Sequence, residues 1–231
     1  HKEYRRQRQM CIRDSLVYAA LLSPKGKYLF DFFISSYSGG YLIDVSSDQA
    51  YKLIQRLNLY KLRADVNIEE TNIKVGRGLE LIPENALQDP RSHMLGWRVY
   101  DPIKTQSATI DWDKIRVENC IPETGIELIA DETYILEANF EILSGVDFRK
   151  GCYVGQEVTA RMKHKTELKK GFVTVEISEV VPVGTTIMSN QKVAGMVFTQ
   201  SKGKAIAYLR FDRVSNNMKA NTADIMYHVQ V

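Results

Sequence analysis

The last part of the chain is a succession of short apolar runs separated by turn residues, and this pattern constrains the fold more than any other feature. The runs FVTVEI, GTTIM, KVAGMVFTQ, KAIAYLRF and ADIMYHVQV are rich in β-branched and aromatic residues, and Gly, Ser and Asn stand between them. Short strands at near-regular spacing are typical of a small closed barrel or a sandwich. The sequence therefore predicts a C-terminal β-barrel domain over 166–231.

The preceding residues 16–165 mix strands with helix, which predicts an α+β body. Residues 18–46 read as a meander of strands, with turns at Pro24–Lys27 and Ser38–Gly40. Further strands and loops are expected over 65–110, followed by a short helix over 111–119.

The clearest helix is predicted over SSDQAYKLIQRLNLYKLRADV (46–66). Its apolar residues recur at three- and four-residue spacing, so one face is apolar. Ser46 with Gln49 has the spacing of a capping box, and Asp48 suits the positive helix start. The Lys and Arg residues on the other face are interpreted as a solvated surface.

Residues 1–15 are predicted to be a non-native leader. Met10–Asp14 back-translate into a string that matches a transposon end used in sequencing adapters, which indicates read-through. The leader holds five Lys/Arg and two Asp/Glu, so it carries the whole net charge of +3, and residues 16–231 hold 26 basic and 26 acidic side chains. A neutral native part gives no argument for direct binding of nucleic acid.

Composition and cysteine count exclude several classes of protein. No apolar run approaches the ~18–20 residues that cross a bilayer, so no membrane association is expected. Outside the leader only Cys120 and Cys152 remain, 32 residues apart and in no CxxC motif. A reducing compartment is favoured, and neither a disulfide framework nor a metal site can be assembled from these residues.

The segment KGCYVGQE (150–157) holds one of these cysteines between two glycines. Lys150 favours the thiolate of Cys152, and the flanking glycines allow a ligand or backbone to approach closely. A Cys–His nucleophile and a buried structural cysteine are the alternatives from the residues alone. The basic run RMKHKTELKK (161–170) is either a solvated linker or a holder of anions such as RNA phosphates.

These residues carry a family resemblance. KGCYVGQE followed by VTARMKH is similar to the signature of the YgfZ family, folate-binding relatives of the glycine-cleavage aminomethyltransferase. SPKGKYLFDFF, LYKLRADV, DPRSHMLGWR, LEANFEILSGVDF, VAGMVFTQ and AIAYLRF resemble the family in order, so the resemblance covers nearly all of 16–231. It implies an aminomethyltransferase-like folate-binding body closed by a C-terminal β-barrel. It also implies a role in iron–sulfur enzyme maturation or repair that indirectly supports tRNA modification.

The resemblance also assigns roles to residues by matched motif. Cys152 is expected to be the key, catalytic thiol, and Asp31, Glu137 and Arg161 are expected to bind tetrahydrofolate or another folate, with Glu137 holding the pterin ring and Arg161 its tail. The remaining expected cofactor-binding residues belong to the signature and are Lys150, Gly151, Tyr153, Gly155, Gln156 and Glu157.

Two departures from the family pattern bear on these expectations. The family begins some forty residues earlier, so the body is expected to be truncated at its N-terminus. Cys120 stands where the family has glycine, and it is interpreted as incidental.

The function predicted from these observations is that of an assembly factor rather than a transferase. Its expected partners are the iron–sulfur assembly machinery or client enzymes, in a bacterial cytoplasm or a mitochondrial matrix. The alternatives are a tetrahydrofolate-dependent aminomethyl transferase, which would use Asp31, and an RNA-binding module built on 161–170.

Overall fold

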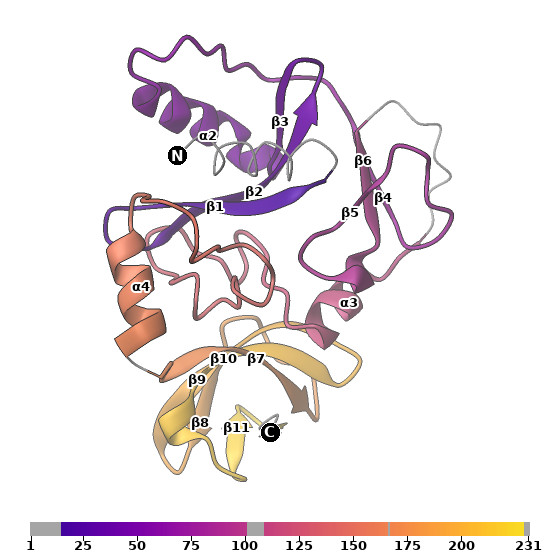
Figure 1. The fold of residues 1–231 in the computed structure, drawn as a ribbon. Helices are drawn as coiled ribbons and strands as arrows, with labels where there is room; N and C mark the ends of the chain where they lie inside the picture. The colour runs from indigo at the N-terminus through magenta and orange to yellow at the C-terminus, as the bar shows by residue number, and fades with distance from the viewer. Residues whose placement is uncertain (1–14, 101–108, 166, 229–231) are drawn as a thin grey trace. The chain divides into compact units, whose positions relative to one another are not determined.

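The computed structural model describes residues 15–100, 109–165 and 167–228 (Figure 1). The leader therefore lies almost wholly outside the described residues, as do the last three residues of the final predicted strand. The chain divides into two compact units. Unit 1 comprises the residues up to Leu21 together with Phe30–Ile110, and unit 2 comprises Leu22–Leu29 and Asp111–Val231.

Unit 1 begins with the predicted meander. Strands β1 (Val17–Leu22), β2 (Tyr28–Tyr37) and β3 (Gly40–Asp44) form a three-stranded sheet in the order β1-β2-β3, and β2 and β3 are antiparallel. The turns fall where glycine and proline predicted them, and Gly26 and Gly39 adopt the positive φ that such turns require.

Helix α2 (Ser47–Tyr60) follows β3, but its start differs from the predicted capping box. The Ser46 hydroxyl donates to the carboxylate of Asp48 and makes no side-chain cap. The hydroxyl thus donates to a neighbouring carboxylate and accepts from no helix amide, a local bond of the kind that short polar side chains make near helix starts. The helix also ends at Tyr60, six residues before the predicted end, and only Leu53 is fully buried along it.

A second sheet in unit 1 is joined to the first through buried charges. Strands β4 (Val75–Gly78), β6 (Trp97–Tyr100) and β5 (Leu87–Gln88) pair in the order β4-β6-β5. Arg98 of β6 bonds to Asp44 of β3 and to Asp89, and Arg91 makes two bonds to the Asp89 carboxylate. Burial by itself would raise the pKa of Asp89, but the bonds and charge of Arg91 outweigh it and hold that pKa below its usual value.

Unit 2 contains a turn-rich segment, residues 119–155, that follows helix α3 (Trp112–Glu118). The predicted short helix is confirmed, and the Asp111 carboxylate caps it by accepting from the Lys114 amide. The segment is ordered by a buried ion pair between Arg116 and Glu127. The Glu127 carboxylate also accepts bonds from the amide and hydroxyl of Thr199, which belongs to the barrel strand β9.

The predicted C-terminal barrel is confirmed. Strands close in the order β10-β7-β12-β11-β8-β9, and inward-facing aliphatic side chains fill its interior. The neighbours are antiparallel, and β-bulges in β9 interrupt the register, as expected where a small sheet closes on itself. The strands are β7 (Lys170–Ile177), β8 (Thr186–Ser189), β9 (Lys192–Ser201), β10 (Lys204–Arg210), β11 (Met218–Ala220) and β12 (Ala223–Met226).

No described helix is long and apolar enough to cross a membrane. Two short 3-10 helices, η1 (His93–Leu95) and η2 (Phe211–Arg213), complete the described elements.

Candidate functional site

The signature segment is held in place by two glycines that pack backbone to backbone. Gly155 has a φ of +83°, and a Cβ at this position would lie 2.7 Å from the Ser23 carbonyl oxygen and 2.9 Å from the Gly26 Cα. Gly26 belongs to the β1–β2 turn and has a φ of +72°. Both glycines are therefore required by the close approach of two chain segments as well as by their own backbone angles.

This contact sets the start of helix α4 (Gln156–Lys165), which the sequence analysis did not predict. The Gly155 carbonyl accepts bonds from the amide and hydroxyl of Thr159, and Thr159 is buried. A Cβ on Gly26 would lie 2.8 Å from the Cβ of Val158, so the same turn also packs against the first turn of α4. The signature thus forms a loop and a helix start fixed on the β1–β2 turn.

The Cys152 side chain is exposed in the irregular part of the signature, and it is a free thiol. The Lys150 ammonium lies 4.4 Å from the centre of the Tyr153 ring, in cation–π range. Burial raises the pKa of Tyr153, and a hydrogen bond with Thr159 partly offsets this rise. Cys152 is therefore exposed, and the lysine and tyrosine that lie close to it in the sequence contact each other.

Cys120 has the opposite environment. It is largely enclosed, and burial raises the pKa of its thiol to about 12. Its φ of +49° is the left-handed conformation that favours glycine, in accord with the glycine expected there. The raised pKa disfavours the thiolate of Cys120 at neutral pH.

Three signature-region residues lie on the outside of α4. The Arg161 guanidinium donates to the Glu157 carboxylate at 2.7 Å, and both side chains are mostly exposed, at 60% and 85%. Helical spacing brings them together as an i,i+4 pair, which is a common surface arrangement. Gln156, which begins the helix, is partly exposed. These residues were predicted to bind folate, and the structure gives Glu157 and Arg161 each other as partners.

Glu137 is a buried carboxylate held from the barrel. Its Oε2 accepts a bond of 2.6 Å from the Tyr208 hydroxyl of β10, and its Oε1 lies 3.9 Å from the Lys170 ammonium. Its backbone carbonyl accepts from the Phe172 amide of β7. Burial raises the pKa of Tyr208, and the bond to Glu137 raises it further, so the phenol stays protonated and donates.

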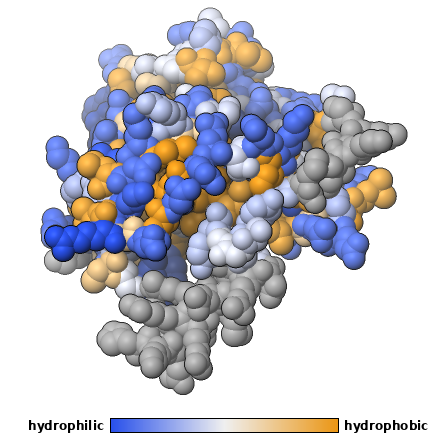
Figure 2. Space-filling model, turned by 90° about the horizontal axis from the view of Figure 1, so that it is seen from above, coloured by the Kyte–Doolittle hydropathy of each residue, from blue (hydrophilic) through white to orange (hydrophobic). Residues whose placement is uncertain are grey.

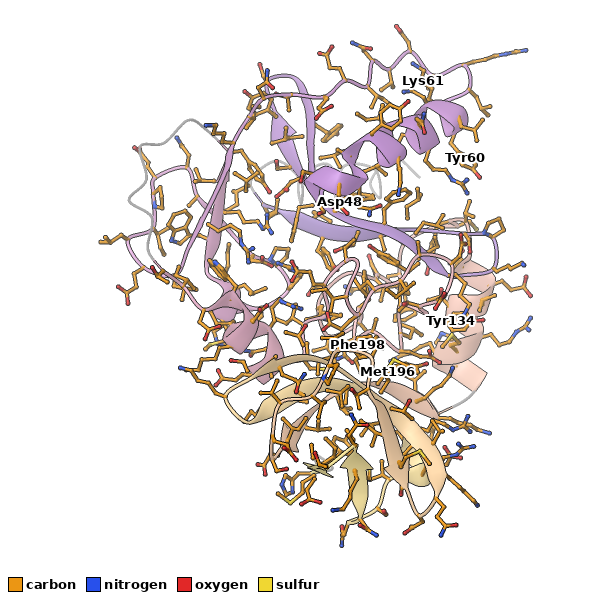
Figure 3. All side chains as sticks on the ribbon, turned by 180° about the vertical axis from the view of Figure 1, so that it is seen from behind. Asp48, Tyr60, Lys61, Tyr134, Met196 and Phe198 are labelled. Atoms are coloured by element: carbon orange, nitrogen blue, oxygen red, sulfur yellow. The ribbon has the colours of Figure 1, made fainter. Side chains whose placement is uncertain are left out.

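Aromatic rings pack beside Tyr208, which donates to this carboxylate. The ring centres of Phe172 and Tyr208 are 5.1 Å apart, and those of Phe172 and Phe198 are 5.4 Å apart. Figure 3 shows Phe198 and Met196 on β9 below Tyr134 of the turn-rich segment. The Lys27 ammonium lies 3.5 Å from the centre of the Tyr134 ring. Unit 2 therefore holds two polar groups beside aromatic rings: the Glu137 carboxylate with Tyr208 and Lys170, and the Lys27 ammonium over Tyr134.

Asp31 lies in unit 1, in a different environment. Its Oδ2 accepts a bond of 2.9 Å from the Tyr18 hydroxyl of β1, and its charge acts on the neighbouring Arg91. The Arg91 guanidinium lies 4.8 Å from the centre of the Phe33 ring and 5.4 Å from that of Tyr18. Asp31 is thus a half-buried carboxylate within a charged and aromatic face of the first sheet.

Within unit 2, the predicted residues fall into three places. Cys152, Lys150, Gly151 and Tyr153 form the signature loop, Glu157 and Arg161 lie along α4, and Glu137 lies against the barrel. Tyr208 and Lys170, which contact Glu137, were not predicted as site residues. The sequence separates Tyr208 from Glu137 by 71 positions, and no local pattern marks the pair. Among the described residues, no cluster of three or more His, Cys, Asp and Glu side chains could hold a metal ion.

Comparison with known proteins adds a family relationship to this geometry. Residues 169–230 match the model of the CAF17 C-terminal β-barrel domain. An iron–sulfur cluster assembly factor IBA57 homolog of Pyricularia oryzae is 32% identical over 178 residues, which cover 66% of this chain and 46% of the relative. The mitochondrial IBA57 of Mus musculus is 24% identical over 244 residues, which cover 90% of this chain and 68% of the relative. Over most of its length the chain is thus similar to curated iron–sulfur cluster assembly factors of the IBA57 type. The family resemblance expected from KGCYVGQE is thereby supported.

The fold prediction is confirmed by a solved structure. The aminomethyltransferase T of the glycine cleavage system from Bartonella henselae superposes with a TM-score of 0.70 at 13% identity, covering 94% of this chain and 76% of that one. At this identity the likeness shows the fold alone. The chain thus has an α+β fold like that of aminomethyltransferase T, with a C-terminal barrel. It spans about half the length of the first curated relative.

Proposed function

We propose that this chain is a folate-binding factor for the maturation or repair of iron–sulfur proteins, with Cys152 as its key thiol. The observation that carries the proposal is the similarity to curated iron–sulfur cluster assembly factors over most of the chain. The exposed thiol in a loop fixed by Gly155 and Gly26 supports it, because an accessible sulfur on an ordered loop can reach a partner protein. The proposed site of action is the mitochondrial matrix, as the names of the relatives suggest.

The donor sets fit a folate in chemical type. Tyr208 occupies one lone pair of the Glu137 carboxylate, which leaves acceptor sites for the N–H groups of a pterin ring. Lys170 and Lys27 supply positive charge suited to a glutamate tail. Asp31 is a second candidate carboxylate, in unit 1. When bound, tetrahydrofolate supplies a nitrogen that can carry a one-carbon unit.

Folate binding is tested with 5-formyltetrahydrofolate by isothermal titration calorimetry. Glu137→Gln and Asp31→Asn keep the size of each side chain while removing its charge, so each is expected to weaken binding about tenfold or more through lost charge-assisted hydrogen bonds. Glu118→Gln is the matched control, because Glu118 is exposed on α3, pairs with Lys114 and was not predicted to bind folate. If Glu137→Gln and Asp31→Asn both bind as tightly as the wild type and the control, neither carboxylate belongs to the folate site.

The maturation role is tested by complementation in cells that lack their own family member, with iron–sulfur enzyme activity measured in extracts. The wild-type protein is expected to restore activity, and Cys152→Ala is expected to fail while remaining soluble. Cys120→Ala serves as the cysteine control because that thiol is enclosed. Rescue by Cys152→Ala would reduce Cys152 to a structural residue. Aminomethyl transfer from the glycine-cleavage carrier protein, if seen in vitro, would favour the transferase alternative.

A further inference from the structure

The two oxygens of the Glu137 carboxylate have unequal partners. The Tyr208 hydroxyl donates to Oε2 at 2.6 Å, whereas the Lys170 ammonium lies 3.9 Å from Oε1, beyond hydrogen-bond distance. No other described residue donates to this carboxylate. The fully buried side-chain atoms without a hydrogen-bond partner in the described residues are all arginine nitrogens, so Oε1 keeps contact with solvent. Glu137 thus has one oxygen held by the barrel and one that can accept from a ligand.

Strand pairing in the barrel fixes the position of the Tyr208 hydroxyl. Tyr208 of β10 lies opposite Phe172 of β7 and Met196 of β9, and its ring centre is 5.1 Å from that of Phe172. The Phe172 amide donates to the Glu137 carbonyl at 2.8 Å. A Cβ on Gly171 would lie 3.1 Å from that carbonyl oxygen, so the two backbones approach closely. The ring of Tyr208 and the backbone of Glu137 are therefore both tied to the start of β7.

The Lys170 ammonium is a competing partner for the same carboxylate. It lies 5.4 Å from the centre of the Tyr208 ring, and the lysine side chain is 42% exposed. Arg210, which stands opposite Lys170 in the β7–β10 ladder, pairs with Asp212 instead. If the ammonium closed on Oε1, a charge-assisted bond would occupy the oxygen that a ligand would use. The bond from Tyr208 opposes this closure, because it holds the other oxygen of the same rigid carboxylate.

A buried carboxylate restricts its ligand more than open apolar surface does. Figure 2 shows apolar side chains lying open among polar ones on the face seen from above, and exposed apolar residues of this kind are ordinary on proteins. Burying a charged group, by contrast, is costly unless hydrogen-bond donors satisfy it. Glu137 therefore calls for a ligand that presents N–H groups.

We propose that Tyr208 is a positioning residue that sets the ligand preference of Glu137: by holding Oε2, it directs Oε1 to accept from the 2-amino group of a pterin ring. The inference rests on the proposed folate function and adds to it the group that the site distinguishes. An amino group at C2 donates hydrogens, whereas an oxo group there turns lone pairs toward the carboxylate. A site that hydrogen-bonds an N–H group rejects the analogue that lacks it.

The test compares pterin with lumazine, which carries an oxo group in place of the 2-amino group. Each competes with 5-formyltetrahydrofolate for the protein in isothermal titration calorimetry. The wild type is expected to prefer pterin at least about tenfold, as for a hydrogen bond to a charged group. Tyr208→Phe is expected to reduce this preference to about threefold or less, because the carboxylate can then turn toward Lys170. In Glu137→Gln the preference should already be lost, and adding Tyr208→Phe should change nothing further.

Ile187→Val is the control for lost stability. Ile187 is a fully buried core residue on β8, a strand that does not pair with β10, and trimming it destabilises the barrel without touching the site. It should keep the wild-type preference for pterin. A purely structural role of Tyr208 would weaken pterin and lumazine alike. Circular dichroism at the temperature of the titration would show that each variant is folded.

The outcomes separate this inference from the folate proposal. Equal affinity of the wild type for pterin and lumazine, or an unchanged preference in Tyr208→Phe, would overturn the inference and leave the folate proposal standing. So would an equal loss of preference in Ile187→Val, because stability alone would then explain it. Failure of the wild type to bind 5-formyltetrahydrofolate would overturn the folate proposal itself, and with it this inference.

Discussion

Replacing Gly155 by alanine is expected to loosen the signature loop through a clash that can be worked out from the structure. Two costs add at this position. The first is the left-handed backbone, with a φ of +83°, which costs an L-residue about 1–2 kcal/mol. The second is the new Cβ at 2.7 Å from the Ser23 carbonyl oxygen, where backbone rather than a flexible side chain must move, and overpacking of this kind costs about 1–3 kcal/mol.

Gly184→Ala is a matched control for the backbone cost alone. Gly184 has a φ of +87° in a barrel turn, and a Cβ there would meet nothing within 4 Å. We therefore expect Gly184→Ala to cost about 1–2 kcal/mol and Gly155→Ala about 2–5 kcal/mol. For a chain of this length each kcal/mol lowers the Tm by about 2–4 °C.

Amide hydrogen exchange would show which part of the chain the Gly155→Ala substitution destabilises. Helix α4 is short and docks through the Gly155–Gly26 contact, so its amides over 156–165 are expected to exchange at least about thirtyfold faster in Gly155→Ala, equivalent to about 2 kcal/mol of opening free energy. The same amides should be unaffected in Gly184→Ala. Equal losses of stability in the two variants, with α4 exchange unchanged, would refute the argument that close backbone approach requires glycine in the signature.

Three further predictions concern buried polar groups. Tyr208→Phe should cost about 1–3 kcal/mol in denaturant unfolding, because a buried carboxylate loses its donor; a value near zero would mean that water replaces the hydroxyl. With the leader cysteine removed, iodoacetamide at pH 8 should alkylate Cys152 at least about a hundredfold faster than Cys120. Because the pKa of Cys120 is raised in the folded state, the free energy of unfolding should also fall as pH rises above the usual thiol pKa. Arg91→Ala should cost about 3 kcal/mol. Since the pKa of Asp89 is lowered in the folded state, its ionised carboxylate stabilises the fold at neutral pH, and this stabilisation is lost as pH falls through the usual carboxyl range. Asp89→Asn should therefore make the free energy of unfolding depend less steeply on pH in that range.

The sequence allowed the sheets and the barrel to be predicted because alternation and turn residues are local signals. Helix α4 escaped prediction because its polar sequence, QEVTARMKHK, has a weak apolar face, and the buried contact that fixes it comes from a turn more than a hundred residues earlier. The capping box at Ser46 was a wrong prediction, since spacing alone does not reveal that Asp48 takes the hydroxyl.

The candidate site was predictable only where the signature is continuous. Cys152 and its neighbours could be named from eight adjacent residues, and the structure adds the exposure of the thiol. The partners of Glu137 come from the barrel, and pairing of β10 with β7 decides which hydroxyl and ammonium reach it. Such long-range partners depend on the register in which strands pair. The sequence predicts where the strands lie along the chain, but it does not predict this register.

The Glu127 carboxylate has a consequence for the order in which the protein is made. Its segment has little helix or strand of its own and relies on Thr199, which is 72 residues further along the chain. A ribosome adds roughly 5–20 residues per second, so the segment waits several seconds beside the exit tunnel before its counterpart emerges. During that interval its apolar side chains are open to chaperones and proteases, and the Glu127 carboxylate has Arg116 but not Thr199 as a partner. Destabilising the barrel should therefore lower the yield of the whole chain in cells, even where the first unit folds normally.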